Sequence, residues 1–253
     1  MNIIVCSKKE GFEAGARKLK EESFQYGKIC KIVEVEDFVD LMAEEYFESE
    51  RALIYFLSSD YRIPLFINRI KQKNQVVNEA FLMRDILMSK FESLERSQLV
   101  GVSVPKHASL TIDNSDFTDK FAVPVFIKSK SPRGLVTRID DKKSFIDKLQ
   151  TLADRSNYYL EENVKHKDNI ELKFYYIDGA VYTQRISNTN TNIPNWFCFV
   201  LNQISKCTEL DVFSVDCLVD WDKRKYYCFD INHASSFYKS DDARRTFITR
   251  ILK

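Results

Sequence analysis

The fold is decided by two apolar runs near the carboxyl end of the chain, SVDCLVD at residues 214–220 and KYYCFDIN at residues 225–232. Both runs are rich in the β-branched and aromatic residues that favour strands, and only a short polar stretch separates them. The sequence therefore predicts a β-hairpin with strands at residues 212–219 and 226–231 and a turn at residues 220–225. Aspartates interrupt its otherwise apolar pattern.

The pairing of the two strands decides which side chains face each other. If Asp220 pairs with Tyr226, the same register places Asp216 opposite Asp230, and Asn232 lies next along on the face of Asp230. Like charges directly opposite each other destabilise a sheet, so such a pair indicates a cation between the carboxylates or a protonated carboxyl. Two carboxylates and an amide oxygen are hard ligands suited to Mg²⁺ carrying nucleotide phosphates. The alternative interpretation is that both aspartates point to solvent, or that the register differs by one residue.

Three lysines in strand or helix patterns are candidates for the positive charge of such a site. Lys128 ends the apolar strand VPVFIK, Lys90 lies inside a helical pattern, and Lys173 interrupts the strand ELKFYY. A lysine at such a position either extends to water or points into a cleft. Together with a carboxylate–asparagine site, three lysines would bind phosphate as point charges without a glycine-rich loop. The alternative for each lysine is an ordinary solvated charge.

The first 60 residues alternate between strand-like and helix-like patterns. Strands are predicted at residues 2–7, 29–35 and 52–57, with helices at residues 11–26 and 37–49 between them. This alternation indicates a small parallel α/β unit. We therefore expect a first domain at residues 1–75 and a second domain at residues 76–253.

The rest of the chain predicts mostly antiparallel structure. The expected elements are a helix at residues 78–99, strands at 102–107 and 123–127, a polar turn at 129–138, a helix at 140–152, a strand at 157–160, and helices at 196–206 and 241–253. Two further strands flank Asp178-Gly179, a dipeptide that strongly favours a hairpin turn. The predicted fold class is an α/β N-terminal unit followed by an α+β body.

Composition excludes several classes of protein. Hydrophobic residues make up 44% of the 253 positions and charged residues 30%, which is typical of a folded globular chain. The net charge is +1, so we expect neither nucleic acid nor a membrane as a partner. The 6 glycines form neither a GxGxxG motif nor a P-loop. Scattered cysteines without a CxxC pair, and a start without a secretion signal, predict a cytoplasmic protein.

The order of these motifs resembles that of the ATP-grasp superfamily over about residues 75–240. Residues 78–105 resemble the segment in which a helix with a phosphate-binding lysine leads into a strand, and VPVFIKSK resembles the strand of the second nucleotide lysine. YYLEENV resembles the adenine-binding hinge, and ELKFYYIDGAVYTQRIS resembles the charged strand pair. SVDCLVD and KYYCFDINHASS resemble the strands of the metal site. The N-terminal unit resembles the α/β domain that precedes the ATP-grasp body.

The resemblance implies ATP and Mg²⁺ as cofactors, with the nucleotide held between two mostly antiparallel sheets. The residues that match the family motifs are Lys173 and Arg185 in the catalytic positions, Lys90, Lys128, Glu161, Glu162, Val164 and Asp168 in the ATP-binding positions, and Asp216, Asp230 and Asn232 in the metal positions. The sequence departs from the family pattern in three places. Lys173 stands where arginine is usual, Asp230 stands where glutamate is usual, and the glycine-rich lid is reduced to residues 129–135.

The resemblance implies an ATP-dependent ligase similar to the enzymes that modify ribosomal protein tails and precursor peptides. Such enzymes join a carboxylate to an amine or a hydroxyl through an acyl phosphate. The expected partner is a small molecule or peptide with a carboxylate, and a homodimer is a further expectation because dimers are common in the family. Lys173 and the Asp-x-Asn of residues 230–232 also resemble the inositol polyphosphate kinases of this fold, which implies a kinase as the alternative. A non-catalytic nucleotide-binding partner is the third interpretation, because the lid is reduced.

Overall fold

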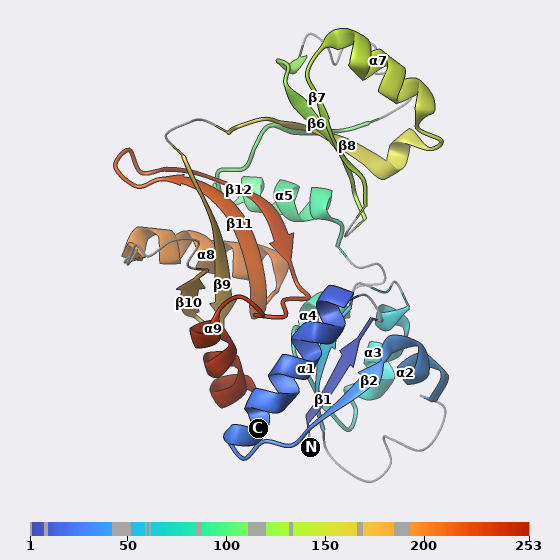
Figure 1. Ribbon diagram of the computed structural model, residues 1–253, viewed down its shortest axis with the longest axis vertical. Coiled ribbons are helices and arrows are strands. Elements are labelled where there is room, and N and C mark those ends of the chain that lie inside the picture. The colour runs from blue at the N-terminus through green and yellow to red at the C-terminus, as the bar shows by residue number, and fades with distance from the viewer. Residues whose placement is uncertain are drawn as a thin grey trace. The chain divides into compact units, whose positions relative to one another are not determined.

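The computed structural model describes residues 2–7, 10–41, 52–58, 60, 62–83, 88–110, 120–131, 134–165, 169–184 and 193–252, and Figure 1 labels most of their elements. The chain forms two units. The first comprises Met1–Met88, Leu172–Val215 and Asn232–Lys253, and the second comprises Ser89–Glu171 and Asp216–Ile231. The boundary between residues 75 and 76 that the sequence suggests stays a prediction.

A parallel sheet forms the N-terminal part of the first unit, as the sequence predicts. Its strands are β1 (Asn2–Cys6), β2 (Cys30–Glu34), β3 (Leu53–Leu57) and β4 (Gln75–Val76), in the order β2-β1-β3-β4. The helices between them are α1 (Glu10–Gln25), α2 (Val35–Leu41), α3 (Ile63–Ile70) and α4 (Glu79–Leu82). All five residues of β1 are buried, because a central parallel strand is covered on both faces. Most of the helix predicted at residues 37–49 lies outside the described residues.

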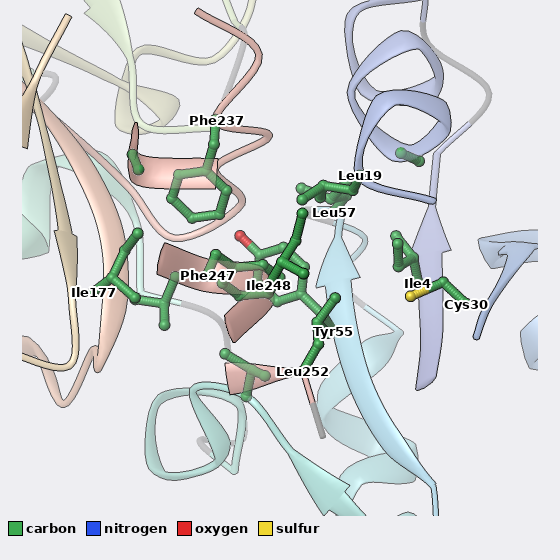
Figure 2. Close-up of a cluster of buried hydrophobic side chains, with 14 of the residues drawn as sticks. Ile4, Leu19, Cys30, Tyr55, Leu57, Ile177, Phe237, Phe247, Ile248 and Leu252 are labelled. Atoms are coloured by element: carbon green, nitrogen blue, oxygen red, sulfur yellow. The ribbon is translucent and has the colours of Figure 1, made fainter. Parts of the chain in front are cut away.

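The core of the first unit joins the two ends of the chain (Figure 2). Ile4 of β1, Leu19 of α1 and Tyr55 of β3 are buried together with Phe247 from the carboxyl end. The ring centroids of Tyr55 and Phe247 lie 4.6 Å apart. Here α9 (Asp241–Thr246) continues into a π-helical turn, η2 (Phe247–Ile251). Each fully buried side chain of this size contributes about 1.5–3 kcal/mol to the free energy of unfolding.

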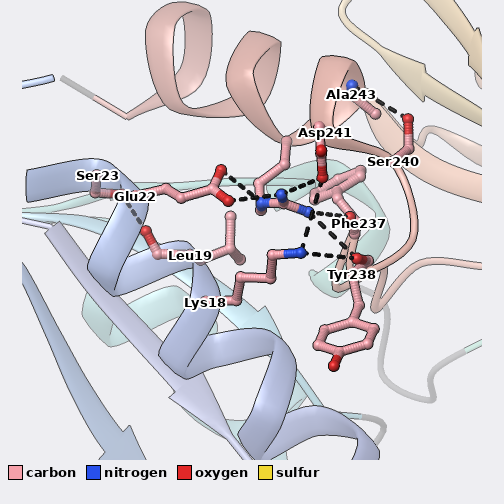
Figure 3. A network of polar contacts seen from close by, with 10 residues as sticks. Lys18, Leu19, Glu22, Ser23, Phe237, Tyr238, Ser240, Asp241 and Ala243 are labelled. Atoms are coloured by element: carbon pink, nitrogen blue, oxygen red, sulfur yellow. Dashed lines mark hydrogen bonds and ion pairs between the residues drawn. The ribbon is translucent and has the colours of Figure 1, made fainter. Parts of the chain in front are cut away.

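A buried arginine, Arg244 of α9, connects the segment after β12 to helix α1. Figure 3 labels its acceptors Glu22, Phe237 and Asp241. Its side chain is 1% exposed, and it makes two 2.6 Å hydrogen bonds to the Glu22 carboxylate. It also donates to the Asp241 carboxylate at 2.5 Å and to the Phe237 carbonyl at 2.9 Å. The planar guanidinium suits this arrangement, since it can serve several acceptors at once. A single arginine in the sequence gives no signal for such a cluster.

His233, which directly follows β12, is a second buried polar group of the first unit. Its Nε2 lies 3.2 Å from the carbonyl oxygen of Ser58, and its ring centroid lies 4.8 Å from that of Phe81. Burial lowers the pKa of His233 to about 4. The imidazole is therefore neutral in the folded protein at neutral pH.

We expect His233 to make stability depend on pH. In the unfolded chain the pKa of this histidine is about 6.5. Below that pH, His233 is protonated in the unfolded chain, whereas in the folded protein it stays neutral until the pH approaches 4. The contribution is complete above pH 6.5 and is lost as the pH falls towards 4, by about 3 kcal/mol in total. Urea unfolding between pH 4 and pH 7 measures this slope. A His233→Gln variant, whose side chain does not titrate, should have a flatter profile, and an unchanged slope would contradict the assignment.

The hairpin sheet contains four strands in the order β10-β9-β11-β12. Its strands are β9 (Ile170–Ile177), β10 (Ala180–Thr183), β11 (Val212–Asp220) and β12 (Lys225–Asn232). Asp178 and Gly179 both have positive φ, 46° and 82°, and Ile177 pairs with Ala180. These values fit the two-residue turn that the sequence predicts at this position. Helix α8 (Asn195–Thr208) packs Phe197 against Phe174 of β9, with ring centroids 4.6 Å apart.

The turn between β11 and β12 is shorter than the sequence suggests. It comprises residues 221–224, so β11 ends at Asp220 and β12 begins at Lys225. The Asp220 carboxylate accepts a hydrogen bond from the N–H of Lys223 at 3.1 Å, and Arg224 has a φ of 51°. An aspartate that caps the turn and a left-handed residue at its end close a four-residue loop. The expected pairing of Asp220 with Tyr226 is thus wrong.

The two cysteines of this hairpin show its register near the turn. The Sγ atoms of Cys217 and Cys228 lie 3.2 Å apart, so these residues face each other. The predicted register would pair Cys217 with Phe229 instead, and it is wrong by one residue here. Asp216 can still face Asp230 if a β-bulge between Cys228 and Asp230 shifts the strand by one residue. That pairing stays a prediction.

The second unit contains a four-stranded antiparallel sheet, which we call the inner sheet. Its strands are β5 (His107–Ser109), β6 (Val125–Ser129), β7 (Val136–Ile139) and β8 (Tyr158–Glu162), in the order β5-β8-β6-β7. Two α-helices, α5 (Lys90–Leu99) and α7 (Lys142–Thr151), and a 3₁₀ turn, η1 (Arg155–Asn157), accompany it. Phe145 of α7 belongs to the buried cluster on one face of the sheet, with Val125, Ile127 and Leu160. The two predicted antiparallel regions are confirmed.

Three sequence predictions between residues 78 and 138 differ from the structure. The helix predicted at residues 78–99 is interrupted, since α4 ends at Leu82 and Ser89 caps a new helix, α5. The strand predicted at residues 102–107 begins only at His107. The turn predicted at residues 129–138 ends earlier, because Val136 already pairs with Lys128. No helix among the described residues is long and apolar enough to cross a bilayer.

Candidate functional site

The register of the inner sheet gathers polar side chains on one face. Phe126 and His107 both pair with Glu161, while Lys128 pairs with Tyr159. Because side chains alternate along a strand, Lys128 and Glu161 share the face opposite the buried apolar cluster. Lys128 therefore points into the unit instead of serving as an ordinary solvated charge.

Lys128 and Glu161 form a buried ion pair between their Nζ and Oε1 atoms, with 14% and 4% of their side chains exposed. The Nζ of Lys128 also lies 5.5 Å from the centroid of the Phe229 ring. Burial raises the pKa of Glu161 above its ordinary value, although the charge of Lys128 opposes this shift. Among the described residues, Glu161 Oε2 has no hydrogen-bond partner. A buried carboxylate oxygen without a donor is suited to accept an N–H or O–H group of a ligand.

A second ion pair, between Lys90 and Asp230, lies in the same unit. Lys90 Nζ is 2.6 Å from Asp230 Oδ1, and the two side chains are 21% and 24% exposed. Ser89 and Glu92 form a capping box that fixes Lys90 as the first residue of α5. The charges of Asp230 and Lys90 both act on the pKa of Glu161, in opposite directions. We call Lys90, Asp230, Lys128 and Glu161 the charged quartet.

Aromatic residues surround the charged quartet. Phe91 of α5 lies with its ring centroid 5.5 Å from that of Tyr159 and 5.1 Å from the Nζ of Lys130. Lys130 donates a 2.6 Å hydrogen bond to Ser109 Oγ. Tyr159 is fully buried, and this burial, followed by the charges of Glu161 and Asp230, raises its pKa. The sequence interpretation missed Lys130, although its spacing of two from Lys128 is the signal of a shared face.

The end of β8 and the segment that follows it contain the predicted hinge residues Glu161, Glu162 and Val164. The N–H of Glu162 donates to the Lys106 carbonyl at 2.8 Å, and the Val164 carbonyl accepts a 3.3 Å hydrogen bond from the Asn169 amide. The Glu162 side chain is exposed. One backbone hydrogen bond and one hydrogen bond from a side-chain amide thus hold this segment in place.

The remaining predicted site residues are distributed over the chain. Lys173 lies in β9 and Asn232 at the end of β12, both in the first unit, and the half-buried Asp216 lies in β11 in the second. Asp168 and Arg185 lie outside the described residues. Three His, Cys, Asp or Glu side chains grouped as in a metal site are not found in the described part of the chain. The predicted metal trio has only two carboxylates, and its assembly stays a prediction.

The segment that the sequence predicts as a reduced lid connects β6 and β7. Ser129 donates its N–H to the Leu135 carbonyl at 2.8 Å, and Gly134 donates to the Ser131 carbonyl at 3.2 Å. A Cβ atom on Gly134 would overlap the side chain of Ser129. Glycine is required here by the close approach of Ser129.

We expect Gly134→Ala to lower the free energy of unfolding by about 1–3 kcal/mol, because the added methyl group overpacks the turn. Denaturant unfolding of the purified protein measures the loss. The double variant Gly134→Ala/Ser129→Gly should recover part of it, since the overlapping side chain is removed. Equal stability of Gly134→Ala and the unchanged protein would contradict the geometry.

Solved structures with a similar architecture cover nearly the whole chain. The RimK-domain ATP-grasp protein of Sphaerobacter thermophilus is 12% identical, with a TM-score of 0.72 over 100% of both chains. The ATP-grasp ligase PsnB, complexed with a minimal precursor, Mg and ADP, is 14% identical, with a TM-score of 0.63 over 92% of this chain and 89% of that chain. The macrocyclase MdnC of Microcystis aeruginosa, bound with the precursor peptide MdnA, is 13% identical, with a TM-score of 0.65 over 99% of both chains.

Neither a protein-family model nor a curated protein matches the sequence itself. The likeness therefore lies in the fold, which consists of a parallel N-terminal sheet and two antiparallel sheets. The chain has the ATP-grasp fold.

Proposed function

We propose that the protein is an ATP- and Mg²⁺-dependent ligase that joins a carboxylate to an amine or a hydroxyl through an acyl phosphate. The charged quartet carries this proposal, because it pairs two half-buried or buried lysines with two carboxylates in an ATP-grasp fold. Such lysines offset phosphate charge, and an acidic partner can be exchanged for a phosphate oxygen when a nucleotide binds.

The proposed site also contains carboxylates, which can bind a divalent ion. Asp216, Asp230 and Asn232 would hold Mg²⁺, which when bound neutralises phosphate charge and orients the phosphate chain. Lys90 would leave Asp230 for a phosphate oxygen and so free that carboxylate for the metal. Lys128 would serve the phosphate chain from β6, where Glu161 holds its ammonium group in position.

The remaining predicted residues complete the proposed site. Glu161, Glu162, Val164 and Asp168 would bind the adenine and ribose, and Lys173 and Arg185 would face the reacting groups. In the first step the substrate carboxylate attacks the γ-phosphorus of ATP, the bond to the bridging oxygen breaks, and ADP leaves. In the second step an amine or hydroxyl attacks the acyl carbon, phosphate leaves, and the nucleophile loses its proton. The lysines stabilise the negative charge that moves onto the phosphate oxygens.

Two of the similar structures support a peptide as substrate. PsnB is complexed with its precursor, Mg and ADP, and MdnC is bound with a precursor peptide. We extend this to the present chain and propose a peptide, a protein tail or an amino acid as the carboxylate donor. A homodimer is a further proposal, made by analogy with the family.

A kinase that phosphorylates a hydroxyl is the second candidate. It is favoured by Lys173 and Asp230, which stand where ligases usually have arginine and glutamate. Lysine cannot bind a carboxylate in the bidentate way that arginine does, so the acceptor of this protein could differ from that of the ligases. A non-catalytic nucleotide-binding partner remains the third candidate, on the basis of the reduced lid.

Trapping the acyl phosphate distinguishes these candidates. The protein is incubated with Mg-ATP, hydroxylamine and pools of amino acids or of Glu- and Asp-rich peptides. A hydroxamate that requires ATP and is absent from Asp230→Asn supports the ligase. A stable phosphorylated product without hydroxamate would establish the kinase. Thermal stabilisation by Mg-ATP with neither product would favour the non-catalytic nucleotide-binding partner.

A further inference from the structure

Two cysteine thiols face each other inside the hairpin of β11 and β12. The Sγ atoms of Cys217 and Cys228 lie 3.2 Å apart, and both side chains are fully buried. The backbone N–H of Cys228 donates to the Ser103 carbonyl at 2.9 Å. Cys228 therefore occupies a position whose N–H points away from β11, where opposed residues of an antiparallel pair approach most closely.

This geometry is close to that of a disulfide. A disulfide needs Cα atoms about 4.4–6.8 Å apart and sulfurs about 2.05 Å apart, and opposed residues at such positions have Cα atoms about 4.5 Å apart. The sulfurs must therefore approach by only about 1 Å. Cys6 and Cys30 of the N-terminal sheet, by contrast, pair with Glu34 and Asn2 and do not oppose each other.

We propose that Cys217 and Cys228 form a dithiol site that a hydroperoxide oxidises to an intramolecular disulfide, and that this disulfide weakens binding of the Mg-nucleotide. The second part rests on the proposed function. Neither similarity to known structures nor the motifs of the sequence assign a role to these cysteines.

The oxidation balances with hydrogen peroxide as the oxidant. The thiolate of one cysteine attacks a peroxide oxygen, the O–O bond breaks, and water leaves once the proton is taken up, which gives a sulfenic acid. The sulfur of the second cysteine attacks the sulfenic sulfur, the S–O bond breaks, and a second water leaves. Two electrons and two protons pass from the thiols to the peroxide, and a small dithiol reverses the reaction by exchange.

Access to the buried thiols requires the turn end of the hairpin to open. Cys217 lies three residues before the end of β11 and Cys228 three residues after the start of β12. β12 is an edge strand of the hairpin sheet. Local opening that also breaks the hydrogen bond between Cys228 and Ser103 can therefore separate its turn end from β11. Oxidation is therefore slower than at the partly exposed Cys198 and Cys207 of α8.

The position of the pair connects oxidation to the proposed metal site. Cys217 directly follows Asp216, and Cys228 lies two residues before Asp230. Mg²⁺ requires near-ideal octahedral geometry with its ligands at about 2.0–2.1 Å. Closing the disulfide moves the strand segments next to both aspartates. Mutation of groups that orient metal ligands weakens metal binding by roughly 10–100-fold, and we expect a disulfide that disturbs this support to act by a similar amount.

The test uses the full chain in a Cys198→Ser/Cys207→Ser background, which removes the more exposed thiols. The protein is treated with hydrogen peroxide, digested without reductant and analysed by mass spectrometry. Thermal stabilisation by Mg-ATP is measured before oxidation, after oxidation and after reduction with dithiothreitol. The matched control is Cys228→Ser, and reversal by dithiothreitol in the unsubstituted hairpin provides the same comparison if that variant does not fold.

We expect a linked pair of peptides containing Cys217 and Cys228 with the loss of two hydrogens. We also expect Mg-ATP affinity to fall roughly 10–100-fold on oxidation, to recover on reduction, and to stay unchanged in peroxide-treated Cys228→Ser. Absence of the linked peptides overturns the dithiol site, and linkage with undiminished Mg-ATP stabilisation overturns its effect on the nucleotide. If the reduced protein is not stabilised by Mg-ATP, the proposed function fails and the switch with it, while linkage alone still establishes the dithiol site.

Discussion

Lys128→Met is expected to lower the free energy of unfolding by about 3–5 kcal/mol, because it leaves the carboxylate of Glu161 buried without its cation. The Glu161 side chain is only 4% exposed, and its second oxygen has no donor among the described residues. Methionine keeps most of the volume and the apolar stem of lysine, so the loss is electrostatic. Urea unfolding at pH 7 measures it.

The pH dependence of this loss identifies Glu161 as its source. Burial raises the pKa of Glu161 above that of an unfolded carboxyl group, so the folded state is penalised only at a pH where the unfolded carboxyl is ionised. The deficit of Lys128→Met should therefore be largest at neutral pH and shrink as the pH falls towards the ordinary carboxyl range. The double variant Lys128→Met/Glu161→Gln should recover much of the stability.

An exposed ion pair in the same unit provides the matched control. Lys165 and Glu171 lie 2.7 Å apart, but their side chains are 56% and 49% exposed. Lys165→Met should cost no more than about 1 kcal/mol, since water screens the pair. Equal losses for Lys128→Met and Lys165→Met would contradict the burial of the charged quartet.

Asp230→Ala is expected to abolish the stabilisation of the protein by Mg-ATP. A ligand at about 100 times its Kd adds about 2.7 kcal/mol to the free energy of unfolding, which raises the melting temperature of a chain of this size by about 5–10 °C. Without Asp230 the predicted metal site loses one carboxylate, and Lys90 loses its 2.6 Å partner. Thermal melts with and without Mg-ATP measure the change within each variant, so a lower starting stability does not affect the result.

The control for this prediction is Asp222→Ala in the turn of the same hairpin. Asp222 is exposed, and the variant should keep the full shift with Mg-ATP. If Mg-ATP raises the melting temperature of Asp230→Ala as much as that of the control, the nucleotide does not bind at the charged quartet. EDTA should remove the shift in the control, since Mg²⁺ carries the phosphate chain in the proposed site.

The sequence predicts those parts of the fold that local patterns determine. The β-rich runs at β1 and β3 and the Asp178-Gly179 turn each specify their element by residue type and spacing. The turn after Asp220 is different, because a four-residue and a five-residue loop suit the same polar stretch. The hydrogen bond accepted by Asp220 and the left-handed conformation of Arg224 select the four-residue loop. The pattern of strand-forming residues predicts neither of these two features.

In the candidate site, too, the sequence predicts the features that local patterns determine and misses those that depend on distant contacts. Lys128 was predictable because a charge at the end of an apolar strand demands a partner, and strand register then brings it to Glu161. The sequence predicts Lys90 inside a long helix, whereas the capping box at Ser89 makes it the first residue of α5. His233 and Arg244 were not predicted as buried groups, since a single polar residue gains its partners only when distant segments pack.

A crystal structure of the protein with Mg²⁺ and a non-hydrolysable ATP analogue tests the central claim most directly. The account predicts one Mg²⁺ bound by the carboxylates of Asp216 and Asp230 and the amide oxygen of Asn232, at about 2.0–2.2 Å, with Lys90 and Lys128 on the phosphate oxygens. A nucleotide bound elsewhere, or one whose metal ion is held by none of these three side chains, would contradict it.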